Sequence, residues 1–290
     1  MPGSRTGLSA AQAELLARLE AAIEFARAEG LDSVVGWCMA AAQGEIPEGD
    51  LAPIIPIIAE FVRECAPAPA RVLDVGAGTG SASLALAADG YELSLLDPAA
   101  VFLETAQKMA EEEGEAGSIR ALICATFTDL EKLEPGSYDV CLCLRSLLYV
   151  HPRREAEEIL LQLGRIAAKA VVVDVASKYG LVLQLGKEFD MSAQAVEQIL
   201  TDGTTPAARP EHGGVVYSCF SSDELGEVAR HAGLTVRRLV GYGITETLEL
   251  GQAEPIPADE AQRIEALLQT EKRMLDTFPS ILALCTRPGD

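Results

Sequence analysis

An aspartate followed by three alternating glycines is the stretch of this chain best suited to bind a ligand. Its residues are Asp74, Gly76, Ala77, Gly78 and Gly80. Glycines let the backbone turn tightly and let a ligand approach it closely. Apolar residues before the turn predict a buried strand, and the alanine- and leucine-rich residues 81–88 predict a helix with free N–H groups at its start. This order of elements forms the first unit of a doubly wound sheet, in which ligands bind at the turn.

The residues around the turn indicate the chemistry of the ligand. The dinucleotide-binding pattern requires a glycine where this chain has Ser81. A carboxylate such as that of Asp74 is poorly placed beside a pyrophosphate and better suited to a ligand with positive charge. S-adenosylmethionine has this property, because it carries a sulfonium and an ammonium group and no phosphate.

A second carboxylate, Asp97, follows the next predicted strand and is followed in turn by Pro98. It lies about twenty residues beyond the turn, where an acid accepts hydrogen bonds from the two hydroxyls of a ribose. Asp97 is also placed to cap the helix predicted over 99–113, and the two roles are compatible. A ribose contact is common to nucleotide and adenosyl ligands, so Asp97 supports the site without selecting the ligand.

The motif Asp74-x-Gly76-x-Gly78-x-Gly80 resembles the first motif of the class I S-adenosylmethionine-dependent methyltransferases of small-molecule type. The segment 138–140, Tyr-Asp-Val, is similar to the aromatic-Asp-aliphatic signature before the fourth strand of that family. The resemblance covers about 70–290 and implies S-adenosyl-L-methionine as the cofactor.

The resemblance also implies where the parts of the cofactor lie. The end of the fourth strand, at Leu144 and Arg145, would lie beside the methionine part and the reacting methyl group. The adenine would lie near Thr126 and Phe127. Many members of the family carry an acid in place of Thr126, so main-chain groups would contact the ring here.

Methyl transfer from a sulfonium is an in-line displacement, so positioning and exclusion of water supply much of the rate and a general base is optional. His151 and Tyr149 follow the fourth strand and are the catalytic candidates. His151 also suits the start of a helix, and Tyr149 also suits the interior. The candidate substrate contacts are Trp37, Tyr149, Asp174, His212 and Tyr217, for which packing or loop exposure is the alternative. Arg145 suits either a bound carboxylate or an acid such as Asp174.

An α/β framework must position these residues. The alternation of strands and helices from Arg71 onward predicts a doubly wound, mostly parallel α/β sheet. The resemblance implies that this sheet is Rossmann-like and has seven strands, with an antiparallel last strand. Residues 1–66 are predicted to form a helical extension, which either covers the site as a lid or packs at the sheet edge. Residues 67–290 are predicted to form the cofactor-binding domain, with a helical insertion at about 177–220 that covers the substrate.

Composition restricts the partners. The net charge is −21 with only 23 lysines and arginines, which argues against nucleic acid. Seven cysteines without a C-x-x-C pair predict reduced thiols, no metal site and a cytoplasmic location. No signal peptide or apolar stretch of membrane-spanning length is found in the sequence. We expect a monomer or homodimer that acts on a small molecule.

The sequence therefore predicts transfer of a methyl group from S-adenosylmethionine to an oxygen, nitrogen, carbon or sulfur atom of a small, biosynthetic acceptor. Two alternatives stay open. A nicotinamide-dependent enzyme of the same fold is disfavoured by Ser81 and Asp74. A non-catalytic partner or sensor that binds S-adenosylmethionine is consistent with Thr126, but the intact glycine turn and Asp97 argue against it.

Overall fold

A mostly parallel sheet forms the centre of the computed structural model, which describes residues 21–24, 27–28, 51, 53–184, 192–207, 216–244 and 256–288. Its strands are β1 (Arg71–Val75), β2 (Glu92–Asp97), β3 (Ile119–Cys124), β4 (Tyr138–Cys143), β5 (Ala167–Ser177), β6 (Cys219–Phe220), β7 (Thr235–Tyr242) and β8 (Ser280–Thr286). The order is β3-β2-β1-β4-β5-β8-β7, and β6 pairs with β5 beside this path. β8 is antiparallel to β5 and β7, and the other pairs are parallel. The predicted doubly wound sheet is confirmed, with the short β6 added.

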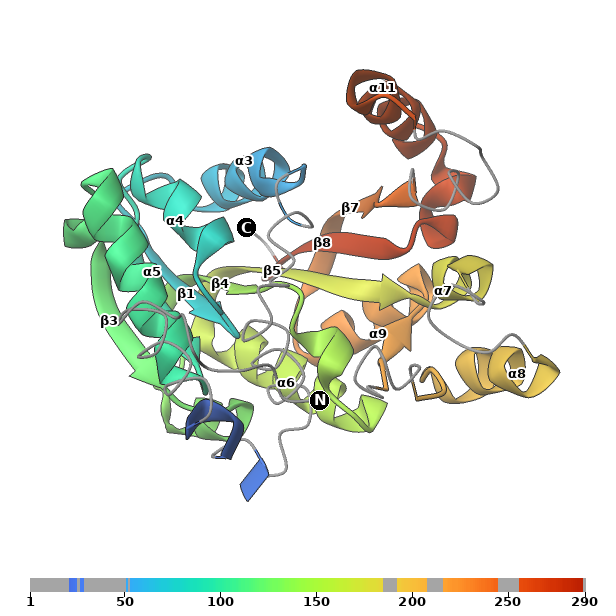
Figure 1. Ribbon diagram of the computed structural model, residues 1–290, viewed down its shortest axis with the longest axis horizontal. Helices are drawn as coiled ribbons and strands as arrows, with labels where there is room; N and C mark the ends of the chain where they lie inside the picture. Colours follow the sequence, from blue (N-terminus) through green and yellow to red (C-terminus); the bar gives the residue numbers. More distant parts are fainter. Residues whose placement is uncertain are drawn as a thin grey trace, which may run out of the picture.

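Helices cover both faces of the sheet (Figure 1). One face carries α3 (Ile55–Cys65), α4 (Ser81–Ala87) and α5 (Ala100–Glu113), and the other carries α6 (Arg153–Ile166) and α9 (Ser222–His231). Side chains alternate between the two cores, so that Val72 packs toward the first helix layer and Leu73 toward the second. Burial on both faces explains why the central strands are continuous apolar runs.

The strand order places the carboxyl end of β1 at the point where the sheet changes direction. β1 lies between β2 and β4, and the helices that follow β1 and β4 cover opposite faces. Open α/β sheets bind their ligands outside the carboxyl ends of the strands at such a point. Two short 3-10 helices begin at this edge: η2 (Phe127–Lys132) after β3 and η3 (Leu147–Tyr149) after β4. A third, η1 (Ala116–Ser118), precedes β3 at the opposite edge.

The segment predicted as an insertion is helical in its described parts. It contains α7 (Lys178–Gln184) and α8 (Ala193–Asp202), which lead to β6. A small core of its own includes Leu181, Ile199 and Cys219 together with Leu148 from η3. The insertion is therefore packed against the segment that follows β4.

The segment between β7 and β8 contains the helix α11 (Ala258–Gln269), which is followed by the 3-10 helix η5 (Lys272–Thr277). The Thr270 hydroxyl donates to the Leu267 carbonyl at 2.7 Å and caps the end. Most of the region 1–52 lies outside the described residues, so the lid stays a prediction, whereas α3 packs Phe61 and Val62 into the core.

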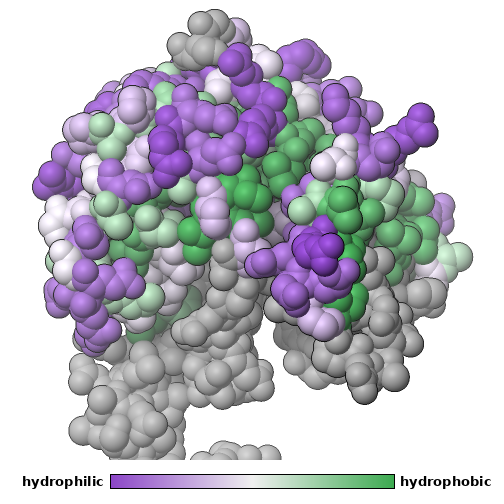
Figure 2. All heavy atoms as spheres, turned by 90° about the horizontal axis from the view of Figure 1, so that it is seen from above, coloured by the Kyte–Doolittle hydropathy of each residue, from purple (hydrophilic) through white to green (hydrophobic). Residues whose placement is uncertain are grey.

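The surface seen from above carries α3, α4 and α11 (Figure 2). Hydrophilic residues cover much of this face, and hydrophobic residues gather toward its middle and one side. Among the described helices, none is both long and apolar enough to cross a membrane.

Candidate functional site

The glycine turn folds over the end of β2. Gly76, Gly78 and Gly80 have positive φ angles of 73°, 55° and 74°. The N–H groups of Gly76 and Ala77 both donate to the Leu96 carbonyl, at 2.8 and 3.0 Å. A Cβ atom on Gly78 would meet no atom within 4 Å, so the middle of the turn faces open space.

Asp97 ends β2 directly beside this turn. Asp97 is only 7% exposed, and its Oδ2 accepts a hydrogen bond of 2.9 Å from the Gly78 N–H. Oδ1 accepts a bond of 2.8 Å from the N–H of Ala99, just before α5. Burial raises the pKa of Asp97 to about 6, although these two N–H groups oppose the shift. A carboxylate has about four acceptor positions, so further hydroxyl donors can still bind.

Asp74 supplies a second buried carboxyl group near the turn. Burial raises its pKa to about 7; the Ser83 hydroxyl lowers this pKa, and the charge of Asp97 raises it. Within the part of the chain that the structure describes, neither carboxylate forms an ion pair. Two neighbouring buried acids without a cation favour a ligand that brings positive charge.

The turn after β4 lies against the glycine turn. The Ser146 hydroxyl donates to the Gly76 carbonyl at 3.1 Å and to the Leu144 carbonyl at 2.9 Å. Arg145 lies between Leu144 and Ser146 in the chain and has a left-handed φ of 53°. Its main-chain N–H donates to Asp174 Oδ1. The structure therefore brings the turn that contains Leu144 and Arg145 next to the glycine turn. Contact of these two residues with the methionine part of the cofactor stays a prediction.

Thr126 has a local role that the sequence reasoning missed. Its N–H donates to Oδ2 of Asp129 at 2.9 Å, and its side chain accepts from the Asp129 N–H, so that the two residues form a capping box at the start of η2. The Thr126 hydroxyl also donates to the same Oδ2, at 3.1 Å. The main-chain N–H of Thr126 is thus already engaged. The spacing Thr-x-x-Asp is the signal that would have revealed it. Phe127 does lie near the site, because a Cβ atom on Gly76 would come within 3.8 Å of its ring.

Two candidate substrate residues lie together beyond the end of β4. The rings of Tyr149 and Tyr217 meet edge to face, with centroids 5.6 Å apart and planes 68° apart. The Ser218 N–H donates to the Leu148 carbonyl at 2.7 Å, which joins the two segments. His151 is exposed two residues after Tyr149. The structure thus places an aromatic pair and a histidine on one side of the carboxyl edge.

The other candidates are less accessible or not described. Asp174 is fully buried in β5, and the Tyr242 hydroxyl donates to its Oδ2. Trp37 and His212 lie outside the described residues. Within the described residues, no group of three or more His, Cys, Asp or Glu side chains is arranged to hold a metal ion.

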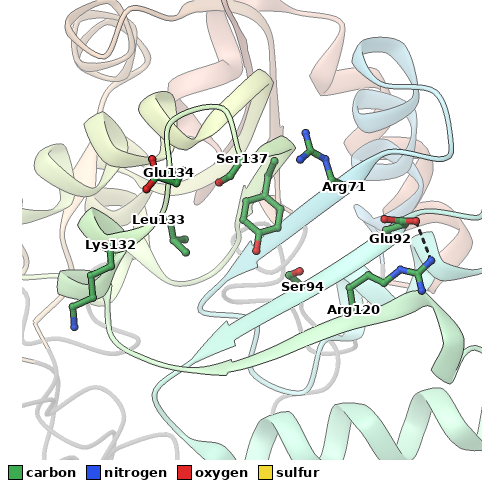
Figure 3. Close-up of a pocket in the computed structure, with 9 residues that line it drawn as sticks. Arg71, Glu92, Ser94, Arg120, Lys132, Leu133, Glu134 and Ser137 are labelled. Carbon is green, nitrogen blue, oxygen red and sulfur yellow. Dashed lines mark hydrogen bonds and ion pairs between the residues drawn. The ribbon is translucent and has the colours of Figure 1, made fainter.

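A groove of about 440 Å³ lies at the opposite, amino-terminal edge of the sheet (Figure 3). Figure 3 shows Glu92 and Arg120 joined across neighbouring strands, at 2.9 Å. Arg71 and Lys132 also line the groove, and they pair with Asp139 and Asp129. Its cations are already neutralised, and the groove is far along the strands from the glycine turn. We therefore place the functional site at the carboxyl edge.

A family model and known relatives match this chain. Residues 72–170 match the family described as "Methyltransferase domain". This match and the relatives below support a class I S-adenosylmethionine-dependent methyltransferase. The ubiquinone biosynthesis O-methyltransferase of Chromobacterium violaceum is 29% identical over 194 residues, which are 66% of this chain and 75% of that protein.

Solved methyltransferases share the fold at low sequence identity. A SAM-dependent methyltransferase from Methanosarcina mazei aligns with a TM-score of 0.56 and 16% identity, over 80% of this chain and 97% of that one. The magnesium protoporphyrin IX methyltransferase of Synechocystis PCC 6803 with bound SAH aligns with a TM-score of 0.50 and 14% identity, over 88% and 87%. These two likenesses concern the fold alone.

The site of this methyltransferase fits the cofactor of its family, S-adenosylmethionine. The open space at Gly78 leaves room for a ligand against the backbone. Asp74 and Asp97 supply buried negative charge beside the turn, which a sulfonium and an ammonium group would compensate. The residues present therefore suit an adenosyl ligand with positive charge.

Proposed function

We propose that this methyltransferase transfers a methyl group from S-adenosylmethionine to a nucleophilic atom of a small-molecule acceptor. The observation that carries the proposal is the pairing of the glycine turn with Asp97, whose carboxylate accepts a hydrogen bond from Gly78 at 2.9 Å. This pairing leaves acceptor positions of a buried carboxylate at the edge of an open space. Ribose hydroxyls are donors of the kind that such a carboxylate accepts.

The residues of the chain would act mainly by binding and orientation. S-adenosylmethionine supplies a methyl group on a positively charged sulfur, which is a good leaving group and needs no acid. Asp97 would accept hydrogen bonds from the ribose, and Asp74 would favour the positive charge of the methionine part. The turn at Leu144 and Arg145 would align that part. Holding the reacting groups in line can supply a large share of the rate.

Tyr149, Tyr217 and His151 would act on the acceptor side. The aromatic pair is held between η3 and β6 and offers ring surfaces and hydroxyls for contact with an acceptor. His151 would accept the proton that the nucleophile loses, because the imidazole nitrogen of a histidine is a common general base. Trp37, Asp174 and His212 stay predicted substrate contacts that we do not assign a step.

The direct test measures S-adenosylhomocysteine formation from S-adenosylmethionine with a panel of phenols, carboxylic acids, amines and thiols. We expect turnover with at least one class and calorimetric binding of both cofactor forms in the absence of acceptor. Tight binding without turnover on any class would contradict the catalytic proposal. Absence of binding would contradict the site itself.

A further inference from the structure

Arg145 has a backbone conformation that its residue type disfavours. Its φ is 53°, and among the described residues other than glycine no second residue has a positive φ. A Cβ atom makes this left-handed region unfavourable. Such a conformation persists only where neighbouring contacts hold it, often at functional sites. The contacts of this turn therefore indicate what it does.

Asp174 holds the turn from β5. It is 0% exposed in a run of valines, so its carboxylate needs hydrogen-bond donors. Oδ1 accepts from the main-chain N–H of Arg145, and Oδ2 accepts from the hydroxyl of Tyr242 at the end of β7. The carboxylate thus joins the ends of three strands at the edge of the sheet where the glycine turn lies.

The side chain of Arg145 contributes to the same cluster. Its Nη1 donates to the Ser280 hydroxyl at 3.3 Å, at the start of β8. Burial raises the pKa of Tyr242, and Asp174 adds to this rise while the charge of Arg145 opposes it. Tyr242 therefore stays a neutral hydroxyl that donates to Asp174.

Ser146 connects this cluster to the glycine turn. Its hydroxyl donates to the Gly76 carbonyl at 3.1 Å, and a Cβ atom on Gly76 would come 2.2 Å from that hydroxyl oxygen. The two turns are in such close contact that a shift of one displaces the other. A continuous series of hydrogen bonds then runs from Tyr242 through Asp174 and the Arg145–Ser146 turn to Gly76.

We propose that Asp174 is a positioning residue for methyl transfer, which holds the Arg145 turn in its left-handed conformation against the glycine turn. This inference rests on the proposed function for its kinetic consequence. The turn would otherwise relax to an ordinary backbone conformation and move away from Gly76. A displacement of about 1 Å at such a place can lower a rate about a hundredfold.

A double-mutant cycle separates this role from direct contact with a ligand. Asp174→Val removes both acceptor atoms and suits a strand rich in valine. Arg145→Gly lets the turn adopt φ 53° without help, because glycine has no Cβ. We expect Asp174→Val to lower kcat about 10- to 100-fold with Arg145 present. In the Arg145→Gly background, we expect the same change to lower kcat less than about threefold.

The same fold loss in both backgrounds would overturn the inference, since it would mean that Asp174 acts other than through the turn. Thr286→Val is the matched control, because it removes a buried hydroxyl at the far end of β8 for which the described residues supply no hydrogen-bond partner. It should leave kcat and KM unchanged. If the Asp174→Val variant does not fold, Tyr242→Phe takes its place in the cycle. We then expect kcat to fall about threefold with Arg145 present and to stay unchanged in the Arg145→Gly background. No loss in either background, or equal loss in both, would overturn it.

A measurement that does not require turnover tests the positioning role independently of the proposed function. Amide hydrogen exchange in residues 76–80 reports the glycine turn, where the Gly76 and Ala77 N–H groups are hydrogen-bonded. Exchange there should rise after Asp174→Val and rise less in the double variant, in the free protein and with S-adenosylhomocysteine added. Unchanged exchange at 76–80 would overturn the inference. Lack of wild-type turnover would contradict only the proposed function.

Discussion

The main-chain N–H of Gly78 donates a hydrogen bond of 2.9 Å to Oδ2 of Asp97, which joins the middle of the glycine turn to the end of β2. The same carboxylate accepts from Ala99 through its other oxygen. Asp97 thus supports the shape of the turn before any ligand binds. In the proposed site, Asp97 would therefore act in two ways, by holding the geometry of the turn and by offering its remaining acceptor positions to the ligand.

Asp97→Ala should weaken the binding of S-adenosylhomocysteine by about 1–3 kcal/mol, because hydroxyls and the Gly78 N–H lose a charged acceptor. Calorimetric titration measures the change. Asp223→Ala, which removes an exposed acid from the first turn of α9, is the matched control. Equal affinity of the Asp97→Ala variant and the wild type would remove Asp97 from the ligand site.

Binding of S-adenosylmethionine should strengthen as pH rises from about 5.5 to 8. Asp74 and Asp97 have pKa values raised to about 7 and about 6, so part of the free protein carries them protonated in this range. A cation favours the ionised carboxylates, so binding should release protons. Calorimetry in two buffers of different ionisation enthalpy measures that release. Proton release should be smaller when the wild type binds S-adenosylhomocysteine, whose sulfur is neutral, and when Asp74→Asn binds S-adenosylmethionine. Proton release equal to that of the wild type with S-adenosylmethionine in both cases would contradict the electrostatic role.

His151→Ala should lower kcat/KM about a hundredfold for an acceptor that must lose a proton, in line with the usual gain from general-base catalysis. His231→Ala provides the comparison, since His231 is an exposed histidine at the end of α9. Initial rates with a phenol and with its ionised analogue measure the effect. A loss of the same size for both acceptors would show that His151 does not act as the base.

Glu224→Gln should destabilise the fold by roughly 2–3 kcal/mol at pH 7, less than for a fully buried pair because Glu224 is partly exposed. Its carboxylate binds the buried Lys178 at 2.5 Å and Arg153 at 3.0 Å. Burial acts to raise the pKa of Glu224, but the bonds to Lys178, Ser221 and Arg153 outweigh it and lower the pKa to about 2. Urea unfolding measures the difference, with Glu227→Gln on the same helix as control.

The pH dependence of that difference has a defined sign. A carboxylate with a lowered pKa in the folded state stabilises fully above its unfolded pKa of about 4.3, and loses this effect as pH falls toward 2. The wild type and Glu224→Gln should therefore converge between about pH 4.3 and 2. If the difference in unfolding free energy between the two proteins stays constant over this range, the effect of Glu224→Gln arises from packing and not from the lost charge.

Two helical glycines should respond to alanine in opposite ways. A Cβ atom on Gly180 in α7 would come 2.1 Å from the Phe278 carbonyl oxygen, so Gly180→Ala should destabilise the protein. A Cβ atom on Gly226 in α9 would meet nothing within 4 Å, so Gly226→Ala should stabilise it by roughly 0.5–1 kcal/mol. Thermal unfolding of both variants measures the signs. The same sign for both would contradict the close approach of α7 to Phe278.

Local sequence signals were sufficient to predict the fold and the contact between the glycine turn and Asp97. The glycine turn and Asp97 lie within one strand–helix–strand unit, so the spacing along the chain already indicates that they meet. The Thr126–Asp129 capping box was equally local and readable, although it was missed. These features depend on backbone geometry over a few residues, and the residue types report that geometry directly.

Only the tertiary structure decided how the end of β4 is held. Arg145, Asp174 and Tyr242 are separated by 29 and 68 residues along the chain, and they meet because β4, β5 and β7 end at one edge of the sheet. The sequence showed the charged residues Arg145 and Asp174 within apolar segments, but it showed neither the involvement of Tyr242 nor which oxygen accepts from which donor. Hydrogen bonds between distant strands depend on strand order and register, which arise from the packing of the whole sheet.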